Sequence, residues 1–150
     1  INEELGDTFR ALFGGGKARL ILEDPTDLLN TGIDIDVQPP GKSVQNIRLF
    51  SGGEKSLIAI SVLFAILKAR PVPLCIFDEV EAALDQGNVE RFARYIKNFS
   101  ERTQFIVVTH RPGTMGQCDV LYGVTMQEQG VSKILRLSLD ELAKQLGITA

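Results

Sequence analysis

The chain has 150 residues, of which 44% are hydrophobic and 23% are charged, with a formal net charge of -3. This length and composition fit one globular domain with its own core, and they exclude a disordered or fibrous chain. A net negative charge excludes the overall positive field that would by itself suggest nucleic-acid binding, so any DNA contact must be local.

The chain begins without an initiator Met, a basic leader or an apolar h-region, which suggests a segment of a longer protein. Its most apolar stretch, 57–67, is about half the length needed to cross a bilayer. We therefore expect a cytoplasmic protein with no membrane contact. Cys75 and Cys118 could in principle pair, but Cys75 stands in an apolar run and is better explained as a buried thiol in a reducing compartment.

Apolar residues at helical spacing predict a helix over the first dozen residues, ended by the glycines at 14–16. Short β-rich pieces follow at 18–22, 32–37 and 44–47, with proline and glycine turns between them. We expect these pieces to form a small antiparallel sheet near the N-terminus.

From residue 51 the pattern changes to that of a long helix at 54–69, apolar on nearly every face and therefore buried on most sides. A strand at 74–77, a helix at 88–99 and a strand at 104–108 come next. This order implies a right-handed crossover that places the two strands side by side and parallel.

Two more strands are predicted at 120–126 and 133–137, around a hairpin-like turn, and a capped amphipathic helix at 138–146. The predicted fold class is therefore α/β, with a mostly parallel sheet flanked by helices and the small antiparallel section near the N-terminus. Residues 1–150 are expected to form a single domain.

A glycine turn, Ser51-Gly52-Gly53-Glu54-Lys55, stands immediately before the long helix. The N-terminus of a helix offers unpaired N–H groups and partial positive charge, and glycines let a phosphate approach the backbone closely. The turn therefore indicates an edge that binds phosphate. An ordinary N-cap serine followed by a glycine turn is the alternative that these five residues alone leave open.

Two acids, Asp78 and Glu79, follow the apolar strand at 74–77. A carboxylate in this place can hold Mg²⁺, and a neighbouring one can polarise the water that attacks a γ-phosphate, although such a pair can also be a solvated turn. Asp85 follows seven residues after Asp78, and His110 ends the next strand. Because the carboxyl ends of adjacent parallel strands meet at one crevice, we expect His110 beside the acids.

The ordered set of motifs resembles the signature motif, Walker B, D-loop and switch histidine of ABC-type ATPases. Within that superfamily, the wording is similar to the C-terminal head of bacterial SMC (structural maintenance of chromosomes) proteins. The similar segments are Leu-Phe-Ser-Gly-Gly-Glu-Lys at 49–55, Phe-Asp-Glu-Val-Glu-Ala-Ala-Leu-Asp at 77–85, Thr-His-Arg at 109–111 and Leu-Tyr-Gly-Val-Thr-Met at 121–126. The resemblance implies the C-terminal lobe of an ABC-ATPase head, with residues 1–14 the end of a returning coiled coil or neck helix.

The resemblance also implies ATP and Mg²⁺ as ligands. Ser51 and Gly53, within the cofactor-binding turn of Ser51, Gly52, Gly53, Glu54 and Lys55, would contact the γ-phosphate of ATP held on an opposing head.

The remaining motifs take the other roles that the resemblance implies. Asp78 would hold the metal and Glu79 would orient or activate the attacking water. Asp85 would reach across the dimer interface, and His110 would sense the γ-phosphate. Glu79 and His110 would thus be the catalytic residues.

Two glycine-lysine stretches look like the end of a Walker A phosphate loop but do not fit it. At 41–43, the loop would need a glycine where Asp36 stands, and the prolines at 39–40 remove two N–H donors. At 14–17, Ala18 replaces the Mg²⁺-binding hydroxyl. The chain thus lacks a phosphate loop, which in SMC proteins lies in the N-terminal half of the head.

We therefore expect an ATPase that works only when completed by the N-terminal half of the same head, in chromosome condensation and segregation at the nucleoid. A second head, a kleisin subunit and DNA in the full complex are the other implied partners. An SMC-like DNA-repair ATPase is one alternative. Another is a non-catalytic module that docks a kleisin through the last strands and the helix at 139–146, whose apolar stripe can equally be core packing.

Overall fold

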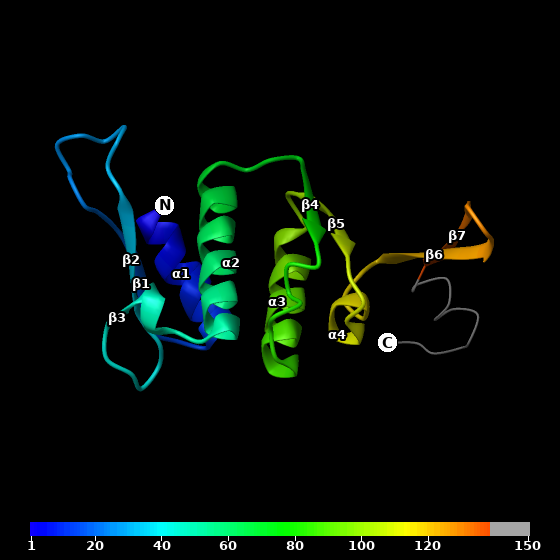
Figure 1. Cartoon of the computed structure of the whole chain (residues 1–150), viewed down its shortest axis with the longest axis horizontal. Coiled ribbons are helices and arrows are strands. Elements are labelled where there is room, and N and C mark those ends of the chain that lie inside the picture. Colours follow the sequence, from blue (N-terminus) through cyan, green and yellow to red (C-terminus); the bar gives the residue numbers. More distant parts are fainter. Residues whose placement is uncertain (139–150) are drawn as a thin grey trace.

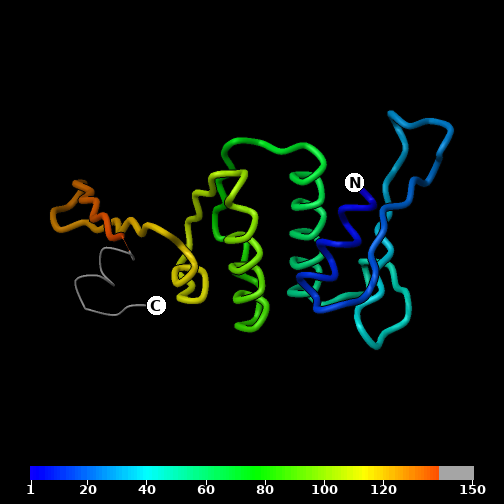
Figure 2. Tube along the Cα trace, turned by 180° about the vertical axis from the view of Figure 1, so that it is seen from behind, coloured from blue at the N-terminus to red at the C-terminus, as the bar shows by residue number. Residues whose placement is uncertain are grey.

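A computed structural model describes residues 1–138 of the chain. Within that range the strands form three sheets, ordered β1-β2-β3, β4-β5 and β6-β7. The molecule is elongated, with the first sheet at one end, the helices and the β4-β5 pair in the middle and the β6-β7 hairpin at the other end (Figure 1). Figure 2 shows the same order from behind.

The antiparallel sheet predicted near the N-terminus is confirmed. Strand β1 (Lys17–Leu22) pairs with β2 (Ile33–Gln38), and β2 pairs with the short β3 (Gln45–Asn46). Strand β3 is shorter than the predicted piece at 44–47 because the 3-10 helix η1 (Ile47–Leu49) begins there. The side chain of Asn46 caps this helix by accepting a hydrogen bond from the Arg48 N–H.

Helix α1 (Asn2–Phe13) packs on this sheet and on α2 (Gly52–Ala69). It ends at Gly14, whose φ of 74° lies in the left-handed region that glycine adopts without strain. The three elements share one hydrophobic cluster. Its buried members are Leu5, Phe9, Ala18, Val37, Phe50, Ile58 and Ala65.

The predicted strand–helix–strand unit is present as β4 (Leu74–Asp78), α3 (Gln86–Phe99) and β5 (Gln104–Val108), and the two strands pair in parallel. Phe64 of α2 is fully buried at the centre of the cluster that joins this unit to α2. It makes close aromatic contacts with Phe77, Phe92, Tyr95, Phe99 and Phe105.

The C-terminal part of the described chain consists of the short helix α4 (Pro112–Met115) and the antiparallel strands β6 (Val120–Glu128) and β7 (Val131–Ser138). The predicted helix at 138–146 lies outside the described residues, apart from its first residue, which ends β7. No helix within residues 1–138 is long and apolar enough to span a membrane.

Both cysteines are free thiols, so the disulfide left open by the sequence is absent. Cys75 in β4 is only partly buried, although the sequence indicated a buried thiol. Burial raises the pKa of Cys75, and it is also the main cause of the raised pKa of Cys118.

The aromatic cluster predicts a large effect of truncating its central ring. We expect Phe64→Ala to lower the free energy of unfolding by about 3–5 kcal/mol, because it leaves a cavity among five rings. Leu29→Ala, at a side chain that is 96% exposed, should change it by less than about 0.5 kcal/mol. Urea unfolding of both variants measures this, and similar losses would contradict the placement of the core.

Candidate functional site

The two acids lie at the carboxyl end of β4, on an exposed edge. Asp78 is the last residue of the strand, and the Glu79 N–H donates to the Val108 carbonyl at 3.0 Å, which continues the pairing with β5. Glu79 has a φ of 48°, the only positive value at a non-glycine residue within 1–138. Such a conformation costs about 1–3 kcal/mol and persists where the surrounding structure enforces it.

His110 lies beside Glu79, as the parallel pairing of their strands predicts. Nδ1 of His110 is 3.3 Å from Oε1 of Glu79. Their side chains are 64% and 53% exposed, so this pair faces solvent rather than the core. The expected neighbourhood of the histidine and the acids is therefore confirmed, while their chemical roles remain predictions.

The glycine turn caps α2. Ser51 is the N-cap residue, and its Oγ accepts a hydrogen bond from the Glu54 N–H at 3.4 Å. In return, Glu54 Oε2 accepts from the Ser51 N–H at 3.1 Å and from the Ser51 hydroxyl at 3.0 Å. This reciprocal arrangement is a capping box, so the N-cap interpretation of Ser51 is correct. Lys55, the last residue of the motif, is exposed on the first turn of the helix.

Lys42 contacts the same turn, which the sequence did not indicate. Its Nζ donates to Glu54 Oε1 at 2.9 Å. This hydrogen bond is the main cause of the lowered pKa of the Glu54 carboxyl, so Glu54 stays ionised to lower pH than usual. Gly41 adopts a φ of 73° in a turn between β2 and β3, which confirms that 41–43 is a turn between strands.

The glycine turn and the acids are on the same side of the molecule. A Cβ on Gly53 would lie 3.0 Å from the Ala83 carbonyl oxygen, so the start of α2 lies directly against the loop that follows the acids. Helices α2 and α3 begin on the same long side of the molecule, the lower side in Figure 1, and β4 runs toward that side. Residues 51–55 and 78–85 therefore border one edge.

Asp85 caps the next helix. It is the N-cap of α3, where its Oδ1 accepts from the Asn88 N–H at 3.0 Å and its Oδ2 accepts from the Asn88 side-chain amide at 2.6 Å. The residue is exposed. Its carboxylate is thus fixed in direction at the edge that Gly53 and the acid loop share.

Behind this edge lies a buried carboxylate, Glu81, whose importance the sequence did not reveal beyond its part in the family wording. It is fully buried and accepts hydrogen bonds from the hydroxyls of Thr109 and Thr114.

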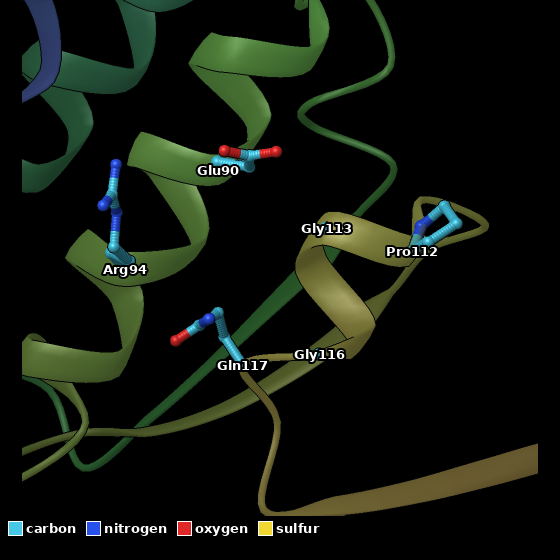
Figure 3. A pocket seen from close by; sticks show the side chains of 6 residues that line it. All are labelled: Glu90, Arg94, Pro112, Gly113, Gly116 and Gln117. Carbon is cyan, nitrogen blue, oxygen red and sulfur yellow. The ribbon is translucent and has the colours of Figure 1, made fainter.

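A shallow pocket of about 300 Å³ lies nearby between α3 and α4 (Figure 3), and none of the predicted site residues contributes to it. Its lining consists of Glu90, Arg94, Pro112, Gly113, Gly116 and Gln117.

Comparisons with known sequences point to one family. The model described as RecF/RecN/SMC N terminal domain matches residues 23–133. The chain is 61% identical over 141 residues to the chromosome partition protein Smc of Bacillus subtilis (strain 168), and 55% identical over 146 residues to that of Mesomycoplasma hyorhinis. These alignments cover 94% and 97% of the chain but 12% and 15% of the two relatives. The chain therefore spans about an eighth of the length of such relatives.

Solved structures show the same fold. One, from work on ATP-driven dimerization and DNA stimulated activation of SMC ATPases, has a TM-score of 0.85 and 43% identity, and the match covers 97% of this chain and 88% of that chain. The Smc head domain with an extended coiled coil from Pyrococcus furiosus, bound to the C-terminal domain of ScpA, has a TM-score of 0.87 and 44% identity, with 97% and 36% covered. The α/β fold class is thereby confirmed. Within residues 1–138 only the β4-β5 pair is parallel and the other strand pairs are antiparallel, so the strand arrangement is mixed rather than mostly parallel. With a family model that spans most of its length and both structures agreeing, the chain belongs to the RecF/RecN/SMC family.

Proposed function

We propose that this chain is the C-terminal half of an SMC ATPase head, which hydrolyses ATP only when the N-terminal half supplies the phosphate loop. The observation that carries the proposal is the shared edge. The capped turn at 51–55 lies against the loop that carries Glu79, and His110 is 3.3 Å from that acid. No Walker A loop occurs in the sequence, so the edge would supply groups that act on a phosphate but not the loop that would hold it.

The acids have the chemistry that the hydrolytic part requires. Mg²⁺ is held by one or two carboxylates together with water and phosphate oxygens, so the exposed Asp78 suits such a site. The metal would neutralise charge on the phosphates. Glu79 would orient or activate the attacking water. His110, close to Glu79, would contact the γ-phosphate.

The turn at 51–55 would bind ATP held by a second head. Within the first turn of a helix, N–H groups lack intrahelical acceptors and the partial charge is positive, which favours an anion. Asp85, fixed at the start of α3, would meet the opposing head. In this arrangement ATP joins two heads because each half-site is incomplete without the other.

An uncovered apolar surface supports the missing N-terminal half as a partner. Parallel strands are normally buried on both faces. One face of the β4-β5 pair is instead exposed by 46–63% at each apolar side chain, namely Leu74, Ile76, Ile106 and Val108. Leu63 and Ile66 of α2 are also 36% and 43% exposed. The N-terminal lobe would cover this face.

The biological role follows from the whole protein that contains such a head. The curated relatives are chromosome partition proteins, and one related solved structure is an Smc head bound to the C-winged helix domain of ScpA. We propose chromosome condensation and segregation at the nucleoid of the cytoplasm, with a second head, a kleisin subunit and DNA as partners. Residues 1–14 would end a returning coiled coil.

The alternatives are less well supported. A DNA-repair ATPase would share the edge, but relatives at 51–61% identity are named chromosome partition protein Smc. A kleisin-binding role is compatible with ATP hydrolysis rather than an alternative to it. The surface expected for that contact is the last strands and the helix at 139–146, and this helix lies outside the described residues.

The base assigned to Glu79 can be tested in the joined head. We expect Glu79→Gln to preserve ATP binding, reduce steady-state ATP hydrolysis by at least about a hundredfold and trap head dimers, since the amide cannot accept a proton from water. Glu101→Gln, an exposed acid beyond α3, is the matched control and should keep its turnover. Unchanged hydrolysis in Glu79→Gln would refute the assignment.

The role of the glycine turn predicts a separate loss. Ser51→Arg should abolish ATP-dependent dimerisation while a single head still binds ATP, because a bulky side chain blocks the exposed N-terminus of α2. Sizing chromatography with and without nucleotide measures this. Leu29→Arg adds the same charge at a side chain that is 96% exposed and should dimerise normally. Dimers of Ser51→Arg would count against the proposal.

The chain alone should bind ATP weakly, with a dissociation constant above about 1 mM, because it has no phosphate loop. Isothermal titration calorimetry of the chain and of the joined head makes the comparison. Micromolar binding by the isolated chain would mean that one of the glycine-lysine stretches at 14–17 or 41–43 holds phosphate after all.

A further inference from the structure

A buried carboxylate that makes no ion pair within residues 1–138 needs an explanation, because removing a charge from water is costly. Glu81 is 0% exposed and lies only two residues after Glu79. Its Oε1 accepts hydrogen bonds from Thr109, which follows β5, and from Thr114 of α4 at 3.0 Å. Its Oε2 has no hydrogen-bond partner within residues 1–138. One carboxylate oxygen therefore joins the loop after β4 to two segments that follow β5.

The loop after β4 and the loop after β5 are joined a second time, which closes a ring of hydrogen bonds. Thr109 Oγ1 accepts from the Arg111 N–H at 3.0 Å, and Nη2 of Arg111 donates to the Leu84 carbonyl at 3.0 Å. The Leu84 N–H in turn donates to the Glu81 carbonyl at 2.9 Å. The circuit, which we call the Glu81 circuit, consists of Glu81, Thr109, Arg111 and Leu84.

Three of the proposed site residues, His110, Asp85 and Glu79, lie next to this circuit or within two residues of it in the sequence. His110 is held between Thr109 and Arg111, and Asp85 follows Leu84. Glu79 precedes Glu81 by two residues, in the left-handed backbone conformation that only its surroundings can enforce. The Glu79 carbonyl also accepts from the Ala82 N–H at 3.0 Å within the same loop. A shift in the circuit would therefore move the acid and the histidine relative to each other.

We propose that Glu81 is a positioning residue for ATP hydrolysis, which holds the Glu79 and His110 side chains in register through the hydroxyl of Thr109. The inference rests on the proposed function of the head. Its physical basis is that reacting groups must be aligned closely, and a misplacement of about 1 Å can cost about a hundredfold in rate. Because both threonine hydroxyls donate to the same oxygen of Glu81, this buried carboxylate holds the loop after β4 and the loop after β5 in one arrangement.

The chain contains a matched control for a purely structural hydroxyl. Thr103, at the opposite end of β5, is 2% exposed, and its Oγ1 donates to the Val72 carbonyl at 2.8 Å. Like Thr109, it donates its hydroxyl from a segment that flanks β5 to a segment that flanks β4, but it does so at the end of the strands away from the acids. Replacement of either threonine by valine keeps the shape and removes one hydroxyl.

The test compares these variants in the head completed by its N-terminal half. Thr109→Val should lower kcat for ATP hydrolysis by about ten- to a hundredfold, with KM for ATP and ATP-dependent dimerisation within about twofold of the parent. Thr109→Ser, which keeps the hydroxyl, should recover most of kcat. Thr103→Val should lower the melting temperature by a similar amount as Thr109→Val and leave kcat unchanged.

Glu81 itself is tested by two substitutions of different chemistry. Glu81→Gln keeps an acceptor for the Thr109 and Thr114 hydroxyls and should retain more of kcat than Glu81→Leu, which removes both contacts. The inference is overturned if Thr109→Val keeps the parent kcat, or loses no more of it than Thr103→Val. Glu79→Gln, run in parallel, separates the failures: if it still hydrolyses ATP the proposed function fails, whereas its inactivity beside an active Thr109→Val overturns only the positioning role.

Discussion

Parallel pairing of β4 with β5 is the constraint from which the site follows. Two strands that run in the same direction end at the same edge, so Asp78 and Glu79 at the end of one come to lie beside His110 at the end of the other. The Glu79 N–H extends this pairing by one residue, to the Val108 carbonyl, before the chain turns away with positive φ. The exposed edge is thus a direct product of strand direction.

The same pairing also explains why one apolar face of the β4-β5 pair is exposed. A parallel sheet is stable when both faces are covered, and here α2 and α3 cover one face while apolar side chains of the other are exposed by about half. Asp78, Glu79 and His110 are exposed too, and Asp78 is a single carboxylate where a metal needs further ligands. The uncovered sheet face lacks a hydrophobic partner, and the site lacks further polar ligands. A partner lobe that covered the open face and brought a phosphate loop to the edge would correct both.

Sequence patterns were sufficient for those features that depend on local periodicity or on strand order. The sequence predicted the end of α1 at Gly14 and the start of α2 after Ser51. It also predicted the crossover from β4 to β5 and the position of His110 beside the acids. The ion pair of Lys42 with Glu54 could not, because it joins residues 12 apart that are brought together by the folding of β3 and η1. Nor could the burial of Glu81, since Thr109 is 28 positions away and the sequence around Glu81 reads as an exposed acidic loop.

The glycine turn shows why a structural and a functional interpretation of one motif need not exclude each other. The capping box uses the side chains of Ser51 and Glu54 and the backbone N–H groups of those same two residues. Capping therefore leaves the N–H groups of Gly52 and Gly53, which have no acceptor within the helix, pointing out of its first turn. Lys42 holds the Glu54 carboxylate in its place in the box. The cap thereby keeps the turn rigid, while the N–H groups of Gly52 and Gly53, which suit an anion, take no part in the capping box. The absence of a Cβ on Gly53 lets this turn lie against Ala83 in the acid loop.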